Sequence, residues 1–327
     1  MIKFSFIIPV KEINDYIRET VPKILAIKRD DYEIIIYPDE VDPNFISLKT
    51  KQIATGHVGP ATKRSRAIND ADGEILVFID DDAYPAADFL EVLELDFQEE
   101  RIKAVGGPAV TPEDDNFWQK VSGAVFLSPL AGGYPERYVP YGLKRNINDW
   151  PSVNFSIRKN TFVELNGFAS EFWPGEDTKL CLDLIRRYPD SIIYDPSLIA
   201  YHHRRSGLLK HLRQVGGYGV HRGFFAKKYP ETSCKLKYFI PSLFLLFVIL
   251  GGALSIFNNI IFRLYLLGWM IYVLALAKAT LDIRHYEKNW SIAWNAVYYI
   301  FLTHLVYGYN FLRGFIFIRE LKSKLRS

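Results

Sequence analysis

The stretch FIDDDAYP, residues 78–85, places three aspartates directly after an apolar segment, residues 74–79, that has the pattern of a buried strand. In an open α/β sheet, the carboxyl end of such a strand lies at the edge where ligands bind. Asp80, Asp81 and Asp82 could instead form a solvated acidic turn, but adjacent carboxylates after a buried strand are costly without a counter-cation. Carboxylate oxygens suit Mn²⁺ or Mg²⁺, so we predict a metal site here.

The segments on either side of this stretch alternate between strand and helix patterns. Strand patterns cover residues 3–10, 32–37, 74–79, 102–105, 152–158 and 191–201, and helix patterns cover residues 14–27, 61–71, 86–100, 160–166 and 176–188. This alternation predicts an α/β fold with a parallel sheet that has helices on its faces. Residues 108–151 are rich in Pro, Gly and Tyr, and we expect them to form loops.

The C-terminal part of the chain is more apolar than the rest. Tyr238–Phe257 contains 20 residues without a charge, enough to cross a hydrocarbon core of about 30 Å. A second segment, Ile260–Leu281, has charges only near its ends, and a third, Ser291–Leu312, carries several polar residues. We therefore expect a first domain at residues 1–235, a membrane region of two to three hydrophobic helices at residues 236–318, and a basic tail at residues 319–327.

Positive charge gathers just before the first apolar segment. Residues 201–237 hold nine Lys and Arg against one acid, although the net charge of the whole chain is only +3. Such a block favours the cytosolic face of a membrane, where anionic lipids attract it. We expect residues 204–235 to lie at the surface of the cell membrane, with a helix break at Gly216, Gly217 and Gly219, and the first domain to stay in the cytosol.

Two rules of membrane topology conflict near the C-terminus. Three spanning helices would place the C-terminus outside, whereas the basic tail and the charged loop Asp282–Asn289 favour the cytosol. His304 and Asn310, in the third segment, would be costly if they faced lipid. We therefore favour two spans, with the third segment lying in the interface or re-entering, and keep a three-span arrangement as the alternative.

Five motifs follow one another along the first 205 residues. They are FIIPVKE (6–12), GPATKRSRAINDADGEILVFIDDDAYP (59–85), NFSIRKNTFVELNGF (154–168), GEDTKLCLDLIRRYP (175–189) and YHHRR (201–205). In this order and spacing they resemble family 2 glycosyltransferases of the GT-A fold, of the succinoglycan-biosynthesis type with a C-terminal membrane anchor. The resemblance implies a Rossmann-like sheet, mixed but mostly parallel with helices on both faces, and a nucleotide-sugar donor.

The resemblance also implies a donor site at the carboxyl ends of the first strands. Asp82 would be a ligand of Mn²⁺ or Mg²⁺, and Asp80 and Asp81 would lie near the ribose. Asp39 would recognise the base of the nucleotide, and Pro9 of the first motif would belong to the same donor site.

The residues alone leave an alternative open for two further parts of this site. Arg64 would meet the donor phosphates, although it could equally be a solvated helix charge. His202 or His203 would complete the metal site, and the alternative is a polar interface beside Arg204 and Arg205. The sequence does not choose between the two histidine rings.

A second chemical site is expected where Gly175-Glu176-Asp177 opens a helix. Inverting transfer needs a base that deprotonates the acceptor hydroxyl. Acids also favour helix N-termini for capping and dipole reasons alone, so the residues by themselves leave the role open. The resemblance implies that Asp177 is the catalytic base, with Glu176 on the acceptor side.

The cations of the basic stretch have two possible roles. Arg204, Arg205, Lys210 and Arg213 could contact anionic headgroups or hold the phosphates of a lipid-linked acceptor. Gln214 is followed by Val-Gly-Gly-Tyr, so the Gln-x-x-Arg-Trp motif of processive polysaccharide synthases is missing. A processive synthase is therefore disfavoured.

The expected reaction is metal-dependent, inverting transfer of one sugar from a nucleoside-diphosphate sugar to a polyprenyl-diphosphate-linked glycan, in cell-surface polysaccharide or glycan assembly. Transfer to a bare polyprenyl phosphate is the closest rival, and a non-catalytic membrane protein that senses nucleotide sugars is a second. The sequence has no Gly-Lys-Ser/Thr phosphate loop, which disfavours a phosphotransferase. The expected partners are the donor, the lipid-linked acceptor and membrane lipids, without nucleic acid.

Overall fold

The computed structural model describes residues 3–132, 134–168, 172 and 174–321. They form two compact units that are not continuous in sequence. Among the described residues, the first unit contains those up to Pro112 and those within Val139–His203, and the second contains those within Glu113–Tyr138 and Arg204–Leu321. The expected boundaries after residues 235 and 318 separate a catalytic from a membrane region, and this division stays a prediction.

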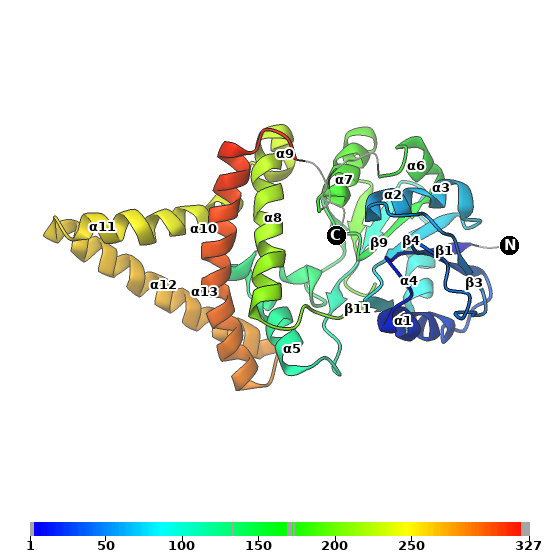
Figure 1. Ribbon diagram of the computed structural model, residues 1–327, viewed down its shortest axis with the longest axis horizontal. Helices are drawn as coiled ribbons and strands as arrows, with labels where there is room; N and C mark the ends of the chain where they lie inside the picture. The colour runs from blue at the N-terminus through cyan, green and yellow to red at the C-terminus, as the bar shows by residue number, and fades with distance from the viewer. Residues whose placement is uncertain (1–2, 133, 169–171, 173, 322–327) are drawn as a thin grey trace. The chain divides into compact units, whose positions relative to one another are not determined.

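The described part of the first unit is built on a mixed sheet of eight strands (Figure 1). Their order is β3 (Thr50–Gln52), β2 (Tyr32–Tyr37), β1 (Phe4–Pro9), β4 (Ile75–Ile79), β9 (Asn154–Arg158), β6 (Ala104–Gly106), β10 (Ile192–Tyr194) and β8 (Arg145–Asn146). The first four run parallel, β9 is antiparallel to both of its neighbours, and β6 and β10 are parallel to each other. The predicted α/β fold with a mixed, mostly parallel sheet is confirmed.

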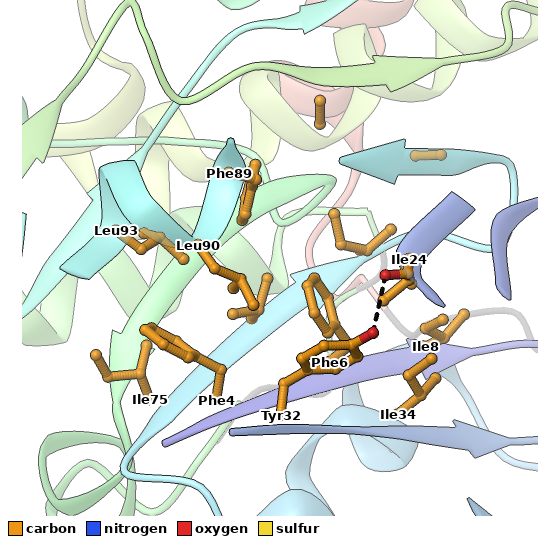
Figure 2. Close-up of a cluster of buried hydrophobic side chains, with 14 of the residues drawn as sticks. Phe4, Phe6, Ile8, Ile24, Tyr32, Ile34, Ile75, Phe89, Leu90 and Leu93 are labelled. Atoms are coloured by element: carbon orange, nitrogen blue, oxygen red, sulfur yellow. Dashed lines mark hydrogen bonds between the residues drawn. The ribbon is translucent and has the colours of Figure 1, made fainter. Parts of the chain in front are cut away.

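Helices cover both faces of this sheet because its strands are apolar on both sides. They are α1 (Asp15–Leu25), α2 (Pro60–Ser65), α3 (Ala67–Asp70), α4 (Phe89–Asp96), α6 (Lys159–Glu164) and α7 (Glu176–Arg187). On one face Phe4, Phe6 and Ile8 pack with apolar residues of α1 and α4, as Figure 2 shows. Since successive strand residues point to opposite faces, Ile7 packs on the other side, with residues of α3, α6 and α7.

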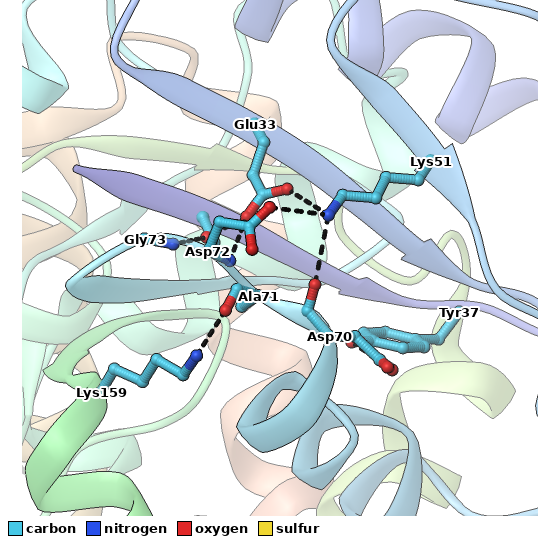
Figure 3. A network of polar contacts seen from close by, with 9 residues as sticks. Glu33, Tyr37, Lys51, Asp70, Ala71, Asp72, Gly73 and Lys159 are labelled. Carbon is cyan, nitrogen blue, oxygen red and sulfur yellow. Dashed lines mark hydrogen bonds and ion pairs between the residues drawn. The ribbon is translucent and has the colours of Figure 1, made fainter. Parts of the chain in front are cut away.

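A buried carboxylate ties this sheet to the turn that precedes β4 (Figure 3). Glu33 of β2 is only 6% exposed and accepts hydrogen bonds from the Ser5 hydroxyl (2.7 Å) and the Asp72 backbone N–H (2.6 Å). Lys51 supplies a compensating charge at 2.7 Å from Glu33. Because a buried carboxylate without partners would be costly, this network helps to fix where β4 begins and therefore where the aspartates after it lie.

Several element boundaries in this unit differ from the expectation. Residues 61–71 form two short helices, α2 and α3, and α4 is shorter than the expected 86–100. The strand pattern at residues 191–201 is divided between β10 in the large sheet and β11 in a second sheet. This second sheet has the order β5 (Ala83–Pro85), β11 (Ala200–His202) and β7 (Ala109–Val110). Asp195 interrupts the run because its carboxylate accepts a hydrogen bond from the Ser197 N–H at 2.7 Å, which closes a turn.

The second unit is helical in its described residues. It contains α5 (Phe117–Ala124), α8 (Leu208–Lys228), α9 (Pro230–Ser233), α10 (Leu236–Leu246), α11 (Gly252–Ser255), α12 (Asn259–Tyr286), α13 (Trp290–Leu312), the 3-10 helices η1 (Val125–Leu127), η2 (Pro129–Ala131) and η3 (Pro135–Arg137), and the π-helical turns η4 (Phe247–Gly251) and η5 (Arg313–Phe317). The expectation that residues 108–151 form only loops is therefore wrong. Asn116 and Gln119 make a capping box at the start of α5, a local helix signal that the Pro- and Gly-rich composition obscured.

Helix α8 is continuous, so the break expected at its glycines is wrong. The glycines instead let α8 approach α13, which lies beside it in Figure 1. A Cβ atom on Gly223 would lie 2.1 Å from the carbonyl oxygen of Phe311, and one on Gly219 would lie 2.8 Å from that of Tyr307. Such a close approach of two helix backbones needs residues without a side chain.

Two helical segments of the second unit are long and apolar enough to cross a membrane, judged by length and composition. Among the described residues they are Leu236–Ser255 and Asn259–Tyr286. Many of their large apolar side chains are exposed, whereas α13 buries a face against α8 and α10. The number of spans and the side of the membrane on which the chain ends stay predictions.

Candidate active site

Three neighbouring strands bring the expected donor residues to one edge of the large sheet. β1 ends at Pro9, which lies opposite Tyr37, the last residue of β2, in a parallel register. β4 pairs in parallel with the other side of β1. Asp39 follows β2 and Asp80–Asp82 follow β4, so both acidic segments lie at the carboxyl edge.

Asp80, Asp82 and His202 direct their ligand atoms to one place. A carboxylate oxygen of each aspartate and a ring nitrogen of the histidine all lie within 4.8 Å of one another. His202 Nε2 is 3.2 Å from Asp82 Oδ1, and Asp82 is only 4% exposed. Two carboxylates held this close repel each other, and together with an imidazole they form a donor set that accommodates a divalent cation.

The pairing of β11 with β5 explains why His202, and not His203, faces the aspartates. His202 lies opposite Ala83, the residue after Asp82, in an antiparallel register. Successive strand residues point to opposite sides, and His203 Nε2 lies 3.3 Å from Glu19 Oε2 instead. The backbone N–H of His203 donates to the Asp82 carbonyl at 2.9 Å, which holds the two segments together at this point.

Asp81 makes a different set of contacts. Its Oδ2 accepts a hydrogen bond from the Asn14 side chain at 2.7 Å, and its carbonyl accepts one from the Thr20 hydroxyl at 3.3 Å. Asn14 also caps α1 by accepting a hydrogen bond from the Ile17 N–H at 2.9 Å. Asp81 therefore ties the acidic segment to the start of α1, and its expected place near a ribose stays a prediction.

Arg64 connects the acidic edge with the N-terminus of α7. Its Nη2 donates to Asp80 Oδ1 at 2.5 Å, and its Nη1 donates to Glu176 Oε1 at 3.1 Å. Because the residue is only 4% exposed, the alternative of a solvated helix charge is wrong. Arg64 Nε and Glu176 Oε2 are buried without a hydrogen-bond partner among the described residues, a condition that a bound ligand could relieve.

Glu176 and Asp177 occupy the first turn of α7. Gly175 precedes them with a φ of 121°, a conformation that glycine adopts without strain. Burial and the neighbouring charge of Asp177 raise the pKa of Glu176 to about 8, although Arg64 opposes the shift. The raised pKa favours the protonated form of Glu176, which is a poor proton acceptor. Asp177 is half-buried and accepts a hydrogen bond from the Thr178 N–H at 2.7 Å.

Lys63 and His57, which hold Asp39, were missed by sequence reasoning. Lys63 Nζ donates to Asp39 Oδ1 and, at 2.6 Å, to the carbonyl of Val10. His57 Nδ1 lies 3.2 Å from Asp39 Oδ2. Burial raises the pKa of Asp39, but these hydrogen bonds outweigh it, so the pKa falls below its usual value. The available signal was the position of Lys63 next to Arg64, a residue already expected to lie in the site.

The four cations expected to meet an acceptor lie in the second unit and differ in their surroundings. The Arg204 guanidinium lies 5.0 Å from the centroid of the Tyr138 ring, and Arg204 is buried. Arg205 is half-buried, whereas Lys210 and Arg213 are exposed. Their contact with an acceptor stays a prediction.

Known proteins resemble this chain over most of its length. Residues 5–165 match the family described as Glycosyl transferase family 2. A relative from Methanococcus voltae is 24% identical over 260 residues, which cover 77% of this chain and 74% of that protein. It is a dolichyl N-acetyl-alpha-D-glucosaminyl phosphate 3-beta-D-2,3-diacetamido-2,3-dideoxy-beta-D-glucuronosyltransferase. The poly(ribitol-phosphate) beta-N-acetylglucosaminyltransferase TarS of Staphylococcus aureus is 28% identical over 129 residues, which cover 34% of this chain and 22% of TarS.

A solved structure shares the fold. It is the mannosyltransferase PcManGT from Pyrobaculum calidifontis in complex with GDP-Man and Mn²⁺, with a TM-score of 0.56 and 16% sequence identity. The match covers 96% of this chain and 87% of that one. The sequence match and the shared fold confirm the expected family and fold. Residues 5–165 of this chain form a family 2 glycosyltransferase domain with the GT-A fold.

Proposed function

We propose that this protein transfers one sugar, with inversion at the anomeric carbon, from a nucleoside-diphosphate sugar to a polyprenyl-diphosphate-linked glycan. The observation that carries the proposal is the connected set of Asp80, Asp82, His202, Arg64 and Glu176. It joins a site for a divalent cation to the helix start that carries a candidate base. The imidazole favours Mn²⁺ over Mg²⁺, whose sites are built mainly from oxygen ligands and water. When bound, the cation would neutralise charge on the departing diphosphate.

The residues of the chain would divide the remaining chemistry. Arg64 carries a permanent charge beside the donor edge, where it offsets negative charge as the bond between sugar and phosphate breaks and the nucleotide leaves with the electron pair. The acceptor hydroxyl forms a bond to the opposite face of the anomeric carbon and gives its proton to Asp177. The raised pKa of Glu176 favours its protonated form, which supports Asp177 as the base of the pair.

Two observations support a lipid-linked acceptor. The relative from Methanococcus voltae is named for transfer to a dolichyl phosphate that already bears a sugar. The two apolar helical segments and the basic stretch before them suit a chain held at the cell membrane with its first unit in the cytosol. A lipid-linked glycan is therefore favoured over a bare polyprenyl phosphate as the acceptor.

A screen of nucleotide sugars tests the proposal. The purified full-length protein is given each donor with Mn²⁺ or Mg²⁺, first alone and then with a polyprenyl-diphosphate-linked glycan or with polyprenyl phosphate. We expect metal-dependent consumption of one donor and transfer only to the lipid that bears a glycan. Transfer to polyprenyl phosphate would support the rival acceptor, and nucleotide-sugar binding without turnover would support a sensor.

A further inference from the structure

A cluster of cations and tyrosines lies beside the start of the first apolar segment, within the second unit. The cluster, which we name the basic tyrosine cluster, consists of Arg137, Arg222, Lys237, Tyr134, Tyr238 and Tyr307. Its members come from the η3 region, α8, α10 and α13. Helix α13 packs against both α8 and α10, which brings these segments together (Figure 1). Of these residues, only Arg222 lies in the basic stretch whose cations were expected to meet headgroups or acceptor phosphates, and the sequence analysis named none of the six as a site residue.

Two tyrosine rings lie among the three cations of the cluster. Lys237 Nζ is 3.7 Å from the centroid of the Tyr134 ring, and the Arg137 guanidinium is 4.5 Å from the same ring. Lys237 and the Arg222 guanidinium lie 5.6 Å and 5.1 Å from the Tyr238 ring. The hydroxyls of Tyr134 and Tyr238 are 3.2 Å apart. A cation that lies over an aromatic ring can still use its N–H donors for another partner.

Positive charge predominates in the cluster. The positive charges of Arg137 and Arg222 repel the Lys237 ammonium group, and the negative charge of Glu136 attracts it. Within the described part of the chain, Lys237 forms no ion pair with a carboxylate. Its ammonium group instead makes cation–π contacts with the rings of Tyr134 and Tyr238. Gathering like charges is unfavourable, and a bound anion would offset the repulsion.

A buried hydroxyl adds independent support for a ligand. The oxygen of Tyr307 is buried and has no hydrogen-bond partner among the residues that the structure describes. Its polar neighbours are Arg222, Tyr134 and Tyr238, and the three tyrosines belong to one packed cluster. A buried hydroxyl without a partner is costly, and an oxyanion could accept its hydrogen bond.

We propose that the basic tyrosine cluster binds the phosphate or diphosphate group of the lipid-linked acceptor. Arg and Lys form charge-assisted hydrogen bonds with phosphate oxygens, and Tyr307 would donate one more. The position favours a lipid as the source, because Lys237 is the second residue of α10 and of the apolar segment Leu236–Ser255. If this segment spans the membrane, the cluster lies at the depth of lipid phosphates. The inference rests on the proposed function and names the group by which the acceptor is held.

The test measures binding rather than turnover, so its outcome does not depend on sugar transfer. Full-length protein in nanodiscs of phosphatidylcholine is titrated with polyprenyl diphosphate, the matching polyprenol, phosphatidylglycerol and inorganic diphosphate. We expect polyprenyl diphosphate to bind about tenfold or more tightly than each of the other three probes. Equal affinity for the polyprenol would overturn the proposal. Equal affinity for phosphatidylglycerol or inorganic diphosphate would show that the cluster binds phosphate groups in general. It would therefore overturn the assignment of the cluster to the lipid-linked acceptor.

Matched variants locate the binding site. Lys237→Gln should weaken binding of polyprenyl diphosphate about fivefold to tenfold, whereas Lys235→Gln should leave it unchanged. Lys235 is exposed and precedes the same helix, so it controls for loss of charge at the membrane surface. Tyr307→Phe keeps the ring and should weaken binding about threefold at unchanged thermal stability. Equal losses of affinity in Lys237→Gln and Lys235→Gln would overturn the assignment of the binding site to this cluster. So would wild-type affinity in both Lys237→Gln and Tyr307→Phe.

The two proposals can fail separately. If the protein binds polyprenyl diphosphate through Lys237 but transfers no sugar to any lipid-linked acceptor, the proposed function is wrong and the binding site stands. If the protein transfers sugar while both Lys237→Gln and Tyr307→Phe bind as well as wild type, the proposed function stands and the binding site is wrong.

Discussion

The two units of the molecule use their cations in different ways. In the first unit Lys63 and Arg64 are buried, and they pair with the carboxylates of Asp39 and Asp80, while Arg64 also donates a hydrogen bond to Glu176. In the second unit the Lys237 ammonium lies over the rings of Tyr134 and Tyr238. A paired cation orients an acid, whereas a cation over a ring can also meet an anion that arrives from outside. Under the proposed function, the donor side is assembled before ligands bind, and a ligand completes the acceptor side.

The largest effect should come from Asp82→Asn. This substitution keeps the volume but removes charge from the group that Asp82 forms with Asp80 and His202. We expect donor turnover to fall by about 10³-fold or more, since a bound metal ion contributes several kcal/mol to such reactions. Release of nucleotide measures turnover, and Asp30→Asn, at a fully exposed side chain, is the control. Full activity of both Asp82→Asn and EDTA-treated wild type would show that no metal acts here.

Asp177→Asn should lower sugar transfer by about 10²–10⁴-fold, the usual worth of a positioned base. Donor and metal binding should persist, because Asp177 lies in the first turn of α7 and outside the group of Asp80, Asp82 and His202. Kinetics and calorimetry on the same samples check this. Loss of nucleotide binding would assign Asp177 to the donor site or to folding.

Glu176→Gln is the comparison variant for Asp177→Asn. Glutamine resembles the protonated glutamic acid that the raised pKa of Glu176 implies. We therefore expect transfer to fall by less than about tenfold at pH 7, far less than for Asp177→Asn. A larger loss in Glu176→Gln than in Asp177→Asn would exchange the roles of the two acids.

Replacing Arg204, Arg205, Lys210 and Arg213 with Gln should weaken use of a lipid acceptor more than donor hydrolysis. Each cation near an anionic surface contributes about 1 kcal/mol, so we expect the KM for the lipid to rise about tenfold or more. Arg204 is buried, so the double variant of the exposed Lys210 and Arg213 separates a surface role from a structural one. Equal loss of both activities in the double variant would contradict the surface role.

Gly223→Ala should destabilise the second unit by about 1–3 kcal/mol, the usual effect of overpacking. Its Cβ would lie 2.1 Å from the Phe311 carbonyl oxygen, so α8 and α13 would have to separate. Gly217→Ala is the matched control, because a Cβ at Gly217 meets nothing within 4 Å. Thermal unfolding in detergent, followed by circular dichroism, compares the two variants. Equal stabilities would mean that the helices are not in this close contact.

A further prediction concerns pH and the stability of the first unit. Burial and the charge of Asp177 raise the pKa of Glu176 to about 8 in the folded state, whereas the unfolded chain releases this proton near the usual value of 4.5. The free energy of unfolding should therefore fall as pH rises through this window, and Glu176→Gln should reduce that dependence. Urea unfolding at pH 5, 6, 7 and 8 measures it. An unchanged pH dependence in Glu176→Gln would mean that Glu176 is ionised in the folded protein.

Much of the first unit could be predicted from local sequence patterns. The apolar strands ending in Pro9, Tyr37 and Ile79 were predicted within one residue, because a buried strand between polar turns has a clear pattern. The antiparallel β9 and the division of residues 191–201 between two sheets depend on long-range pairing, which no local pattern encodes. The glycines of α8 were misread because their role depends on α13, almost 100 residues later.

The site was predictable where an acid follows a strand and unpredictable where partners come from elsewhere. Asp82 and Asp177 stand in motifs, whereas the contact of Arg64 with both Asp80 and Glu176 exists only in the folded chain. The preference for His202 over His203 depends on strand register. Motifs therefore indicate which residues are candidates for the site, but not which of these residues contact one another in the folded chain.

The configuration of the transferred sugar tests the central claim most directly. The product formed by the wild-type protein from its nucleotide sugar and a lipid-linked glycan is analysed by NMR, with and without EDTA. Single displacement at a metal-bound donor, with Asp177 as the base, predicts a product with inverted anomeric configuration that forms only without EDTA. A product that retains the configuration of the donor would contradict this account, as would one that forms equally well in EDTA.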